Sequence, residues 1–163
     1  MAADMLLDGN VKVSWVPTIT SIAAPTAAEL TAGVALESRL TPDGLDISFD
    51  TTMIDNSALG SSYNTEAVGR SKVSISLKYK AQAVGSTDPV ATALVYQAVG
   101  YLVVRRGTPA TTAFAAAQKV EVYPAQVGRP NPDAVAPNAI QTVTVKMGST
   151  GDPRGWDNPA TLA

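Results

Sequence analysis

Hydrophobic and polar residues alternate in two neighbouring stretches of the chain, and this alternation predicts a pair of β-strands. The apolar positions are all odd-numbered: Leu45, Ile47, Phe49, Val73, Ile75, Leu77 and Tyr79. A period of two places these side chains on one buried face of each strand. We predict an antiparallel pairing that sets Ile47 opposite Leu77, Phe49 opposite Ile75, and Asp46 opposite Lys78 on the polar face. A slip of one residue would turn the apolar face to water, so the pattern specifies the pairing.

The predicted connection between these two strands is far longer than an ordinary hairpin turn. Residues 53–71 show little apolar periodicity, whereas hairpin loops usually contain about 2–5 residues. A loop of this length in a compact domain is usually functional or disordered. We interpret residues 53–71 as an inter-strand assembly loop that contacts another subunit.

The rest of the chain predicts more strands and one clear helix. A helix is predicted over residues 90–99, with Asp88 as N-cap, Pro89 in the first turn and Gly100 just beyond its end. Thr26 and Glu29 have the spacing of a capping box, which predicts a short helix or turn over residues 27–32. Five further segments predict strands: residues 11–15, 34–40, 101–106, 119–127 (interrupted by Pro124) and 140–147.

These elements predict a single, mainly β domain over residues 1–163. The expected architecture is an antiparallel β-sandwich or partly closed barrel with one flanking α-helix. The sequence Thr-Pro-Asp-Gly at residues 41–44 predicts a turn before the first of the two paired strands. Residues 1–10 are expected to form an N-terminal arm, and residues 148–163 an irregular C-terminal tail. Trp156 in that tail is expected to dock on this subunit or on another.

Charge is sparse and unevenly distributed. Charged residues make up 16% of the sequence, against about 25% in an average soluble domain. Either neighbouring molecules cover much of the surface, or the sequence is simply rich in small residues. Residues 1–66 contain nine acids and two bases, whereas residues 67–163 contain five acids and ten bases. The two parts either neutralise each other within one sheet or favour head-to-tail packing of copies.

The sequence predicts no enzyme, cofactor or metal site. It contains no histidine and no cysteine, which removes the commonest general base and the commonest metal ligands. Asp46, Asp50 and Asp55 either form a carboxylate site for a sugar or a cation, or lie on a solvated strand face. Arg105 and Arg106 either contact phosphate, or point to opposite faces of a strand with one paired to an acid.

Nothing in the sequence predicts a membrane-bound protein. The first ten residues lack the basic region of a signal peptide. The longest apolar stretch, residues 90–104, is shorter than the roughly 20 residues of a membrane-spanning helix. We therefore expect synthesis in a cytoplasm and no membrane partner.

Four segments together resemble the major tail tube proteins of long-tailed bacteriophages, particularly those of actinobacterial hosts. They are VKVSWVP, then LTPDGLDISFDTTMIDNSALGSSYNTEAVGR running into SKVSISLKYK, then DPVATALVYQAVGYLVVRRG, and finally VEVYPAQVGRPNP followed by NAIQTVTVKMGSTGDP. The resemblance spans most of the chain and lies in the order of the elements, since no single motif is diagnostic.

The resemblance implies a structural virion protein that polymerises as stacked hexameric rings into the tail tube, the conduit for genome delivery. It implies further copies of the chain as partners, with the tail terminator and the tail-tip proteins. The tape-measure protein and double-stranded DNA would occupy the lumen without specific binding. The protein would be assembled in the host cytoplasm and located in the virion tail. Other readings are a capsid decoration protein, a tail terminator protein or a secreted carbohydrate-binding sandwich.

The tail tube reading assigns residues to two surfaces. The candidate inter-subunit contacts are Met53, Ile54, Leu59, Tyr63 and Trp156. The candidate lumen-facing residues are Asp46, Ser48 and Asp50. Acids and hydroxyls suit a lumen through which DNA slides, because each lysine or arginine that contacts phosphate adds affinity for DNA.

Overall fold

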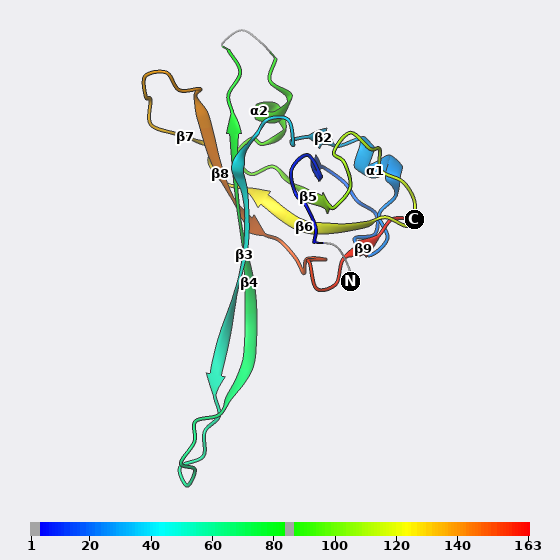
Figure 1. The fold of residues 1–163 in the computed structure, drawn as a ribbon. Coiled ribbons are helices and arrows are strands. Elements are labelled where there is room, and N and C mark those ends of the chain that lie inside the picture. Colours follow the sequence, from blue (N-terminus) through cyan, green and yellow to red (C-terminus); the bar gives the residue numbers. More distant parts are fainter. Residues whose placement is uncertain (1–3, 84–86) are drawn as a thin grey trace.

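The structure, a computed structural model, describes residues 4–83 and 87–163, and consists mainly of antiparallel strands. Its elements in chain order are β1 (Val11–Val16), α1 (Ala27–Thr31), β2 (Val34–Ala35), β3 (Leu40–Asp55), β4 (Glu66–Lys80), α2 (Pro89–Ala93), β5 (Val99–Arg106), β6 (Lys119–Val127), β7 (Asn131–Pro132), β8 (Thr142–Ser149) and β9 (Ala160–Thr161). The strands follow the order β2-β1-β5-β6-β8-β4-β3, with β7 added to β8 and β9 to β6. Figure 1 shows a rounded body from which the β3–β4 hairpin projects.

The sheet folds over to enclose the main core but does not close into a barrel. Strands β1, β5 and β6 supply one side of this core, and β4 and β8 supply the other, with β3 at its margin. Within the described residues, the sheet ends at β2 on one side and at β3 on the other, and these two strands do not pair with each other. The predicted class, a mainly β antiparallel fold, is confirmed.

A second, smaller core covers the opposite face of β1, β5 and β6. Val16, Val103 and Val122 from these strands pack with Leu30 of α1 and with Leu162 near the C-terminus. These three strands are therefore buried on both faces along much of their length.

The predicted register between β3 and β4 is wrong by two residues, although the predicted faces are right. Ile47 lies opposite Ile75, Phe49 opposite Val73, and Asp46 opposite Ser76 instead of Lys78. A period-two pattern specifies which side chains share a face, but a shift by two residues leaves the faces unchanged. The sequence pattern alone cannot distinguish such registers.

The predicted turn at residues 41–44 is instead an irregularity within β3. Pairing shifts between Leu40 and Leu45 while the strand continues. A Cβ atom on Gly44 would meet the backbone oxygen of Lys78 and would lie 2.6 Å from Thr41 Oγ1. Glycine thus permits the close approach of β4 at a bulge.

The predicted helix over residues 90–99 is confirmed only at its beginning. Asp88 caps α2 by accepting hydrogen bonds from the backbone nitrogens of Val90 and Ala91 (3.0 and 3.2 Å). The helix ends at Ala93, and residues 97 and 98 instead form backbone hydrogen bonds with Val127. The sheet ladder that continues into β5 overrides the local helical preference. Gly100 accordingly lies inside β5 instead of ending a helix.

The remaining predicted elements differ from the structure mainly at their ends. The capping box at Thr26 and Glu29 is present and starts α1, so that two short helices flank the sheet instead of one. Pro124 does not interrupt β6, since it lies opposite Tyr101 inside the strand. The segment 34–40 contains only the two-residue β2 before β3 begins. The C-terminal tail is more regular than predicted, because β9 pairs with β6.

Candidate functional site

The β3–β4 hairpin is an arm that extends beyond the body of the protein. Its strands remain paired as far as Asp55 opposite Glu66, so the unpaired connection comprises residues 56–65 only. Both ends of the loop predicted over residues 53–71 are therefore strand, residues 53–55 in β3 and residues 66–71 in β4. Figure 1 shows this hairpin leaving the body, with no other element beside its outer half.

Hydrogen bonds within the arm hold its tip in shape. The backbone nitrogen of Asn56 donates to the oxygen of Thr65 (3.0 Å), and that of Thr65 donates to Ser57 Oγ (3.0 Å). Ser57 also donates from its backbone to Asp55 Oδ1 (2.8 Å). Hydrogen bonds from Ser57 lower the pKa of Asp55. The tip is thus ordered by local contacts and not by the body of the protein.

Large apolar side chains on the arm are exposed to solvent. The exposed fraction is 53% for Met53, 54% for Ile54, 79% for Tyr63 and 73% for Val68, and Leu59 is fully exposed. An isolated two-stranded hairpin is marginally stable in water, and contiguous exposed apolar side chains usually mark an interaction surface. The structure thus gathers four of the five predicted contact residues on the arm. Val68, which lies opposite Met53, was not among the predicted contacts because the sequence did not reveal this pairing.

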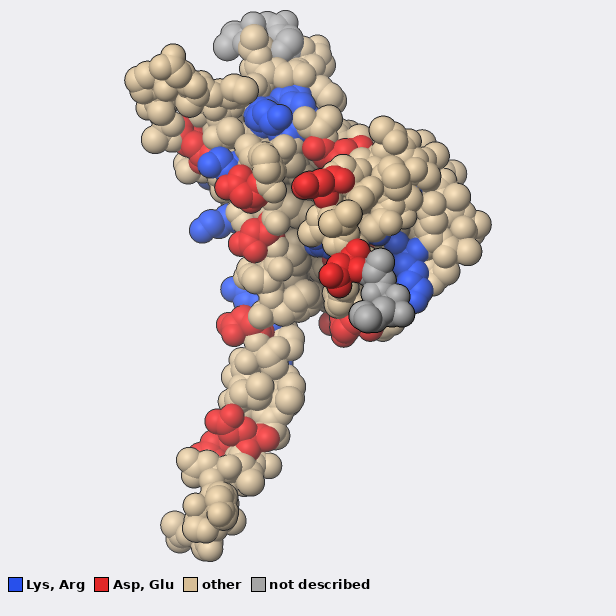
Figure 2. Space-filling view, in the orientation of Figure 1, with Lys and Arg blue, Asp and Glu red and all other residues tan. Residues whose placement is uncertain are grey.

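The polar face of β3, β4 and β8 carries charges of both signs. Asp46, Ser48 and Asp50 are all exposed on this face, and lysines from the neighbouring strands share it. Lys72 lies opposite Asp50, and Lys146 lies opposite Ser76, which itself pairs with Asp46. Figure 2 shows basic and acidic side chains next to each other along this part of the molecule. From the sequence, Lys78 was expected on this face opposite Asp46, whereas Lys72 and Lys146 were missed because they join the face through strand pairing.

A carboxylate ties β7 to this polar face. Asp133 accepts hydrogen bonds from the hydroxyls of Thr142 (2.6 Å) and Thr144 (2.9 Å) and forms an ion pair with Lys78 Nζ at 3.4 Å. The pKa of Asp133 is lowered, chiefly by the hydrogen bond from Thr142 and then by that from Thr144. These contacts stabilise the packing of β7 against β8 and link it to β4.

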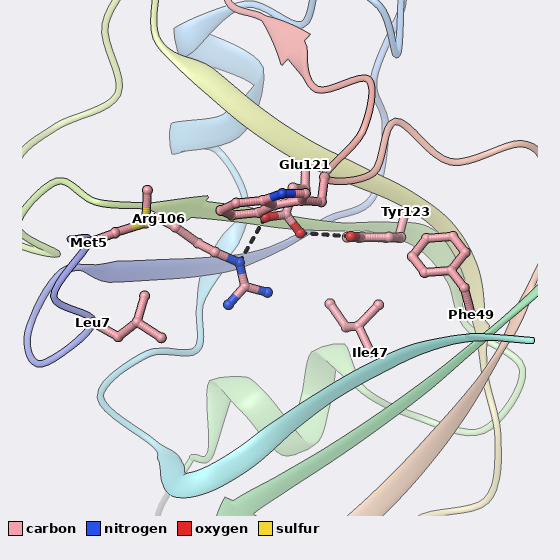
Figure 3. Close-up of a pocket in the computed structure, with 8 residues that line it drawn as sticks. Met5, Leu7, Ile47, Phe49, Arg106, Glu121 and Tyr123 are labelled. Atoms are coloured by element: carbon pink, nitrogen blue, oxygen red, sulfur yellow. Dashed lines mark hydrogen bonds and ion pairs between the residues drawn. The ribbon is translucent and has the colours of Figure 1, made fainter. Parts of the chain in front are cut away.

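Trp156 lies at a pocket between the body, the N-terminal segment and the base of the arm. The pocket has a volume of about 440 Å³, and Figure 3 shows its side chains. Its lining residues are Met5, Leu7, Ile47, Phe49, Arg106, Glu121, Tyr123 and Trp156. Trp156 is 66% exposed, so this subunit does not bury it, and it is separate from the arm.

The polar side chains of this pocket form hydrogen bonds with one another. Arg106 Nε donates to Glu121 Oε1 at 2.8 Å, and Tyr123 Oη donates to Glu121 Oε2 at 2.7 Å. Burial, followed by the neighbouring Glu121 carboxylate, raises the pKa of Tyr123. A carboxylate with both oxygens engaged is poorly placed to act as a general base.

The two consecutive arginines have different roles, as one of the two sequence readings expected. Arg106 pairs with Glu121, whereas Arg105 is buried on the other side of β5. Arg105 donates hydrogen bonds of 2.9–3.0 Å to four oxygens in the following loop: those of Pro109, Thr112 and Ala113, and Gln118 Oε1. Its guanidinium therefore fixes residues 109–118 and is not presented to a phosphate.

The described residues contain neither a candidate metal cluster nor a candidate membrane-spanning helix. No group of three or more histidine, cysteine, aspartate or glutamate side chains there is arranged to hold a metal ion. No helix within residues 4–83 and 87–163 is long and apolar enough to cross a membrane.

Comparison with known proteins identifies the family. The model of a family described as phage tail tube protein matches residues 1–158. The chain belongs to the phage tail tube protein family. The resemblance to tail tube proteins is thereby confirmed, whereas the actinobacterial host group stays a prediction, and the protein is a structural component of the virion tail tube.

Solved structures share the fold of this tail tube protein at low sequence identity. One is a chain from the baseplate of the anti-feeding prophage, with 11% identity, a TM-score of 0.62, and coverage of 94% of this chain and 96% of that one. Another comes from the virion of a native gene transfer agent particle, with 14% identity, a TM-score of 0.53, and coverage of 82% and 91%. No protein with curated annotation matches the sequence.

Proposed function

We propose that this tail tube protein polymerises as stacked hexameric rings, and that the projecting arm makes a contact between subunits that polymerisation requires. The observation that supports this is the set of exposed apolar side chains on the arm, where Leu59 is fully exposed and Tyr63 is 79% exposed. The arm extends away from its own body, so another copy must bury these side chains. We also assign an inter-subunit contact to Trp156, whose ring is 66% exposed at the pocket.

The polar face of β3, β4 and β8 is proposed to line the lumen, with Asp46, Ser48 and Asp50 exposed to the passing genome. Acids next to lysines, as at Asp50 and Lys72, offset the attraction of the bases for phosphate. A lumen of this mixed charge would bind double-stranded DNA weakly, because phosphate affinity grows with the number of unopposed bases. The tape-measure protein would occupy the same lumen before the genome passes.

The other proposals follow from a structural role in a tail. The protein would be assembled in the host cytoplasm and would meet a tail terminator protein at one end of the tube and tail-tip proteins at the other. Such a role requires no catalysis and no cofactor.

The arm proposal is tested by replacing residues 56–65 with Asn-Gly. The new two-residue turn joins Asp55 to Glu66, which already face each other in the ladder, so the strands should remain paired. We expect a folded subunit with unchanged circular dichroism that forms no tubes in electron micrographs. Ser62→Ala, a small change within the same loop, serves as the control and should polymerise normally.

The outcomes of this test separate the candidate functions. Tubes formed by the shortened variant would show that the tip is dispensable and would overturn the role proposed for the arm. If the wild-type chain forms only discrete rings that never extend, a tail terminator role would replace the tube proposal.

A further inference from the structure

Two rows of paired residues place an acidic and a basic region on opposite sides of the part of the sheet formed by β4 and β8. In one row, Asp46 of β3 lies opposite Ser76, and Ser76 lies opposite Lys146 of β8. The next backbone in this row is that of Gly128, whose nitrogen donates to the oxygen of Lys146 at 2.8 Å. Arg129 follows Gly128, so it lies at the margin away from β3.

The second row reaches the turn between α2 and β5. It runs from Ile47 through Ile75 and Met147 to Val127, and the backbone nitrogen of Gln97 donates to the oxygen of Val127 at 2.9 Å. The turn around Gln97 therefore lies at the same margin as Arg129, with β4, β8 and the end of β6 between it and β3.

In the part of the chain that the structure describes, the outer edge of β3 has unpaired backbone groups, and two of its acids form no ion pair. β3 is 16 residues long, and within the described residues nothing pairs with its outer edge. Asp46 and Asp50 are exposed, and neither forms an ion pair with a described residue. A long open edge is a template for pairing with another chain. We call Asp46 and Asp50 the acidic margin.

The opposite margin offers exposed apolar side chains next to a base. The guanidinium of Arg129 lies 4.2 Å from the centre of the Tyr96 ring, and no carboxylate of the described residues pairs with it. The exposed fraction is 50% for Val95, 46% for Tyr96 and 60% for Val99. We use the name basic corner for the set Val95, Tyr96, Val99, Arg129 and Lys146. Pro130 and Pro132 beside it cannot donate to an added strand.

Ion pairs within the described part of the subunit do not neutralise the excess of acids in residues 1–66 with the excess of bases in residues 67–163. Among the pairs of the described residues, only that between Arg39 and Asp88 (3.0 Å) joins residues 1–66 to residues 67–163. Asp46, Asp50 and Arg129 thus form no ion pair with a described residue of the same copy. Complementary charges on opposite margins suit repeated contacts between identical subunits.

We propose that the acidic margin of one copy binds the basic corner of the next copy. This inference rests on the proposed function, because it assigns the lateral contact within each ring. The contact is heterologous: each copy uses its β3 side on one neighbour and its Tyr96–Arg129 side on the other, so repetition closes a ring. The half-exposed Phe49, whose exposed fraction is 49%, lies between the two acids in sequence and adds apolar surface to this side.

Two charge-reversal variants test this contact. The first, Asp46→Lys with Asp50→Lys, makes both margins of a copy basic. The second, Arg129→Glu with Lys146→Glu, makes both margins acidic. We expect each variant alone to need at least about tenfold more protein than the wild type to polymerise, since like charges in contact cost several kcal/mol. An equimolar mixture should polymerise with the two variants alternating, because each contact then joins opposite charges.

Polymerisation is followed by light scattering and electron microscopy at low salt. The two charge-reversal variants carry different tags, and crosslinks between the two tags measure whether the variants alternate in the polymer. The matched control pair, Lys119→Glu and Asp152→Lys, alters exposed charges elsewhere and should polymerise like the wild type. Unimpaired polymerisation of either reversal variant, or a mixture no better than its components, would overturn the inference while leaving the tube intact. Failure of the wild-type chain to form rings or tubes would overturn the proposed function and the lateral contact together.

Discussion

Tyr123 Oη donates a 2.7 Å hydrogen bond to Glu121 Oε2, two residues earlier on β6. Residues two apart on a strand share a face, so the phenol lies beside the carboxylate. Arg106 on β5 donates to the other carboxylate oxygen at 2.8 Å. Because Glu121 is only 5% exposed, these two donors replace the water that a charged carboxylate would otherwise bind.

Tyr123→Phe is therefore expected to destabilise the subunit by about 1.5–3 kcal/mol, the usual range for a hydrogen bond to a charged group. Urea unfolding monitored by circular dichroism measures the change. Tyr101→Phe is the control, because its half-buried hydroxyl forms no hydrogen bond with a described residue. An equal loss of stability in both variants would show that the Glu121 contact contributes nothing specific.

Much of the fold was predictable from the sequence, because its strands are half-buried or continuously apolar. The alternation at Ile47, Phe49, Ile75 and Leu77 correctly specified which side chains share a face. It could not specify the register, since a shift by two residues preserves the faces. Likewise, the capping signals at Asp88 located the start of α2, but the sheet ladder around Gln97 determined its end.

The candidate site was predictable in part. Exposed Leu59 and Tyr63 were identified from a polar stretch that is too long for a turn. Lys72 and Lys146 were missed because strand pairing across the sheet brings them onto the polar face, Lys72 opposite Asp50 and Lys146 opposite Ser76. The Tyr96–Arg129 stack was missed because Tyr96 was assigned to a helix. Contacts between residues distant in sequence leave no local signal.

Leu59→Ser combined with Tyr63→Ser should weaken tube formation without affecting the folded subunit. Both side chains are exposed at the tip, so we expect the stability of the monomer to change by no more than about 0.5 kcal/mol. Polymerisation should need a higher protein concentration, as measured by sedimentation. Ser61→Ala is unsuitable as a control because its hydroxyl donates to the Tyr63 oxygen (2.9 Å); Ser62→Ala is used instead. Normal tubes from the double variant would refute burial of these side chains between subunits.

Ser48→Lys tests the lumen assignment while retaining both neighbouring acids. Ser48 is exposed on the polar face between Asp46 and Asp50. A lysine there adds a phosphate contact in each subunit, so we expect normal tubes but slower genome ejection, with a steep dependence on salt. Ser48→Glu is the matched control and should eject DNA at the normal rate. Identical ejection by both variants would show that this face does not line the lumen.

The capping box predicts a pH dependence of stability. Glu29 accepts hydrogen bonds from the backbone nitrogens of Thr26 (2.8 Å) and Thr20 (2.9 Å). Hydrogen bonds that these threonines donate, chiefly the one from the Thr26 backbone, lower the pKa of Glu29 from 4.5 to about 2. Since the folded-state pKa is the lower one, the stabilisation is complete above pH 4.5 and is lost as the pH falls toward 2.

Glu29→Gln should therefore lower Tm at pH 7, and the difference from the wild type should shrink between pH 4.5 and pH 2. Differential scanning calorimetry across this range measures both. Glu66→Gln, at an exposed position without an ion pair to a described residue, provides the comparison. A difference in Tm that stays constant over the whole range would contradict the role of the ionised carboxylate.

The β7 side and the β3 side differ in the backbone hydrogen-bonding groups that are available to another polypeptide. Pro130 and Pro132 lack amide hydrogens at the β7 side, whereas the outer edge of β3 is open along its length. An unassembled subunit is therefore vulnerable to templated aggregation along β3. An incomplete ring of any length leaves the outer edge of β3 uncovered in its terminal copy. Only closure of the ring covers this edge. A host cell that accumulates this protein faster than rings close should therefore form inclusion bodies, and covering β3 in each free copy should prevent them.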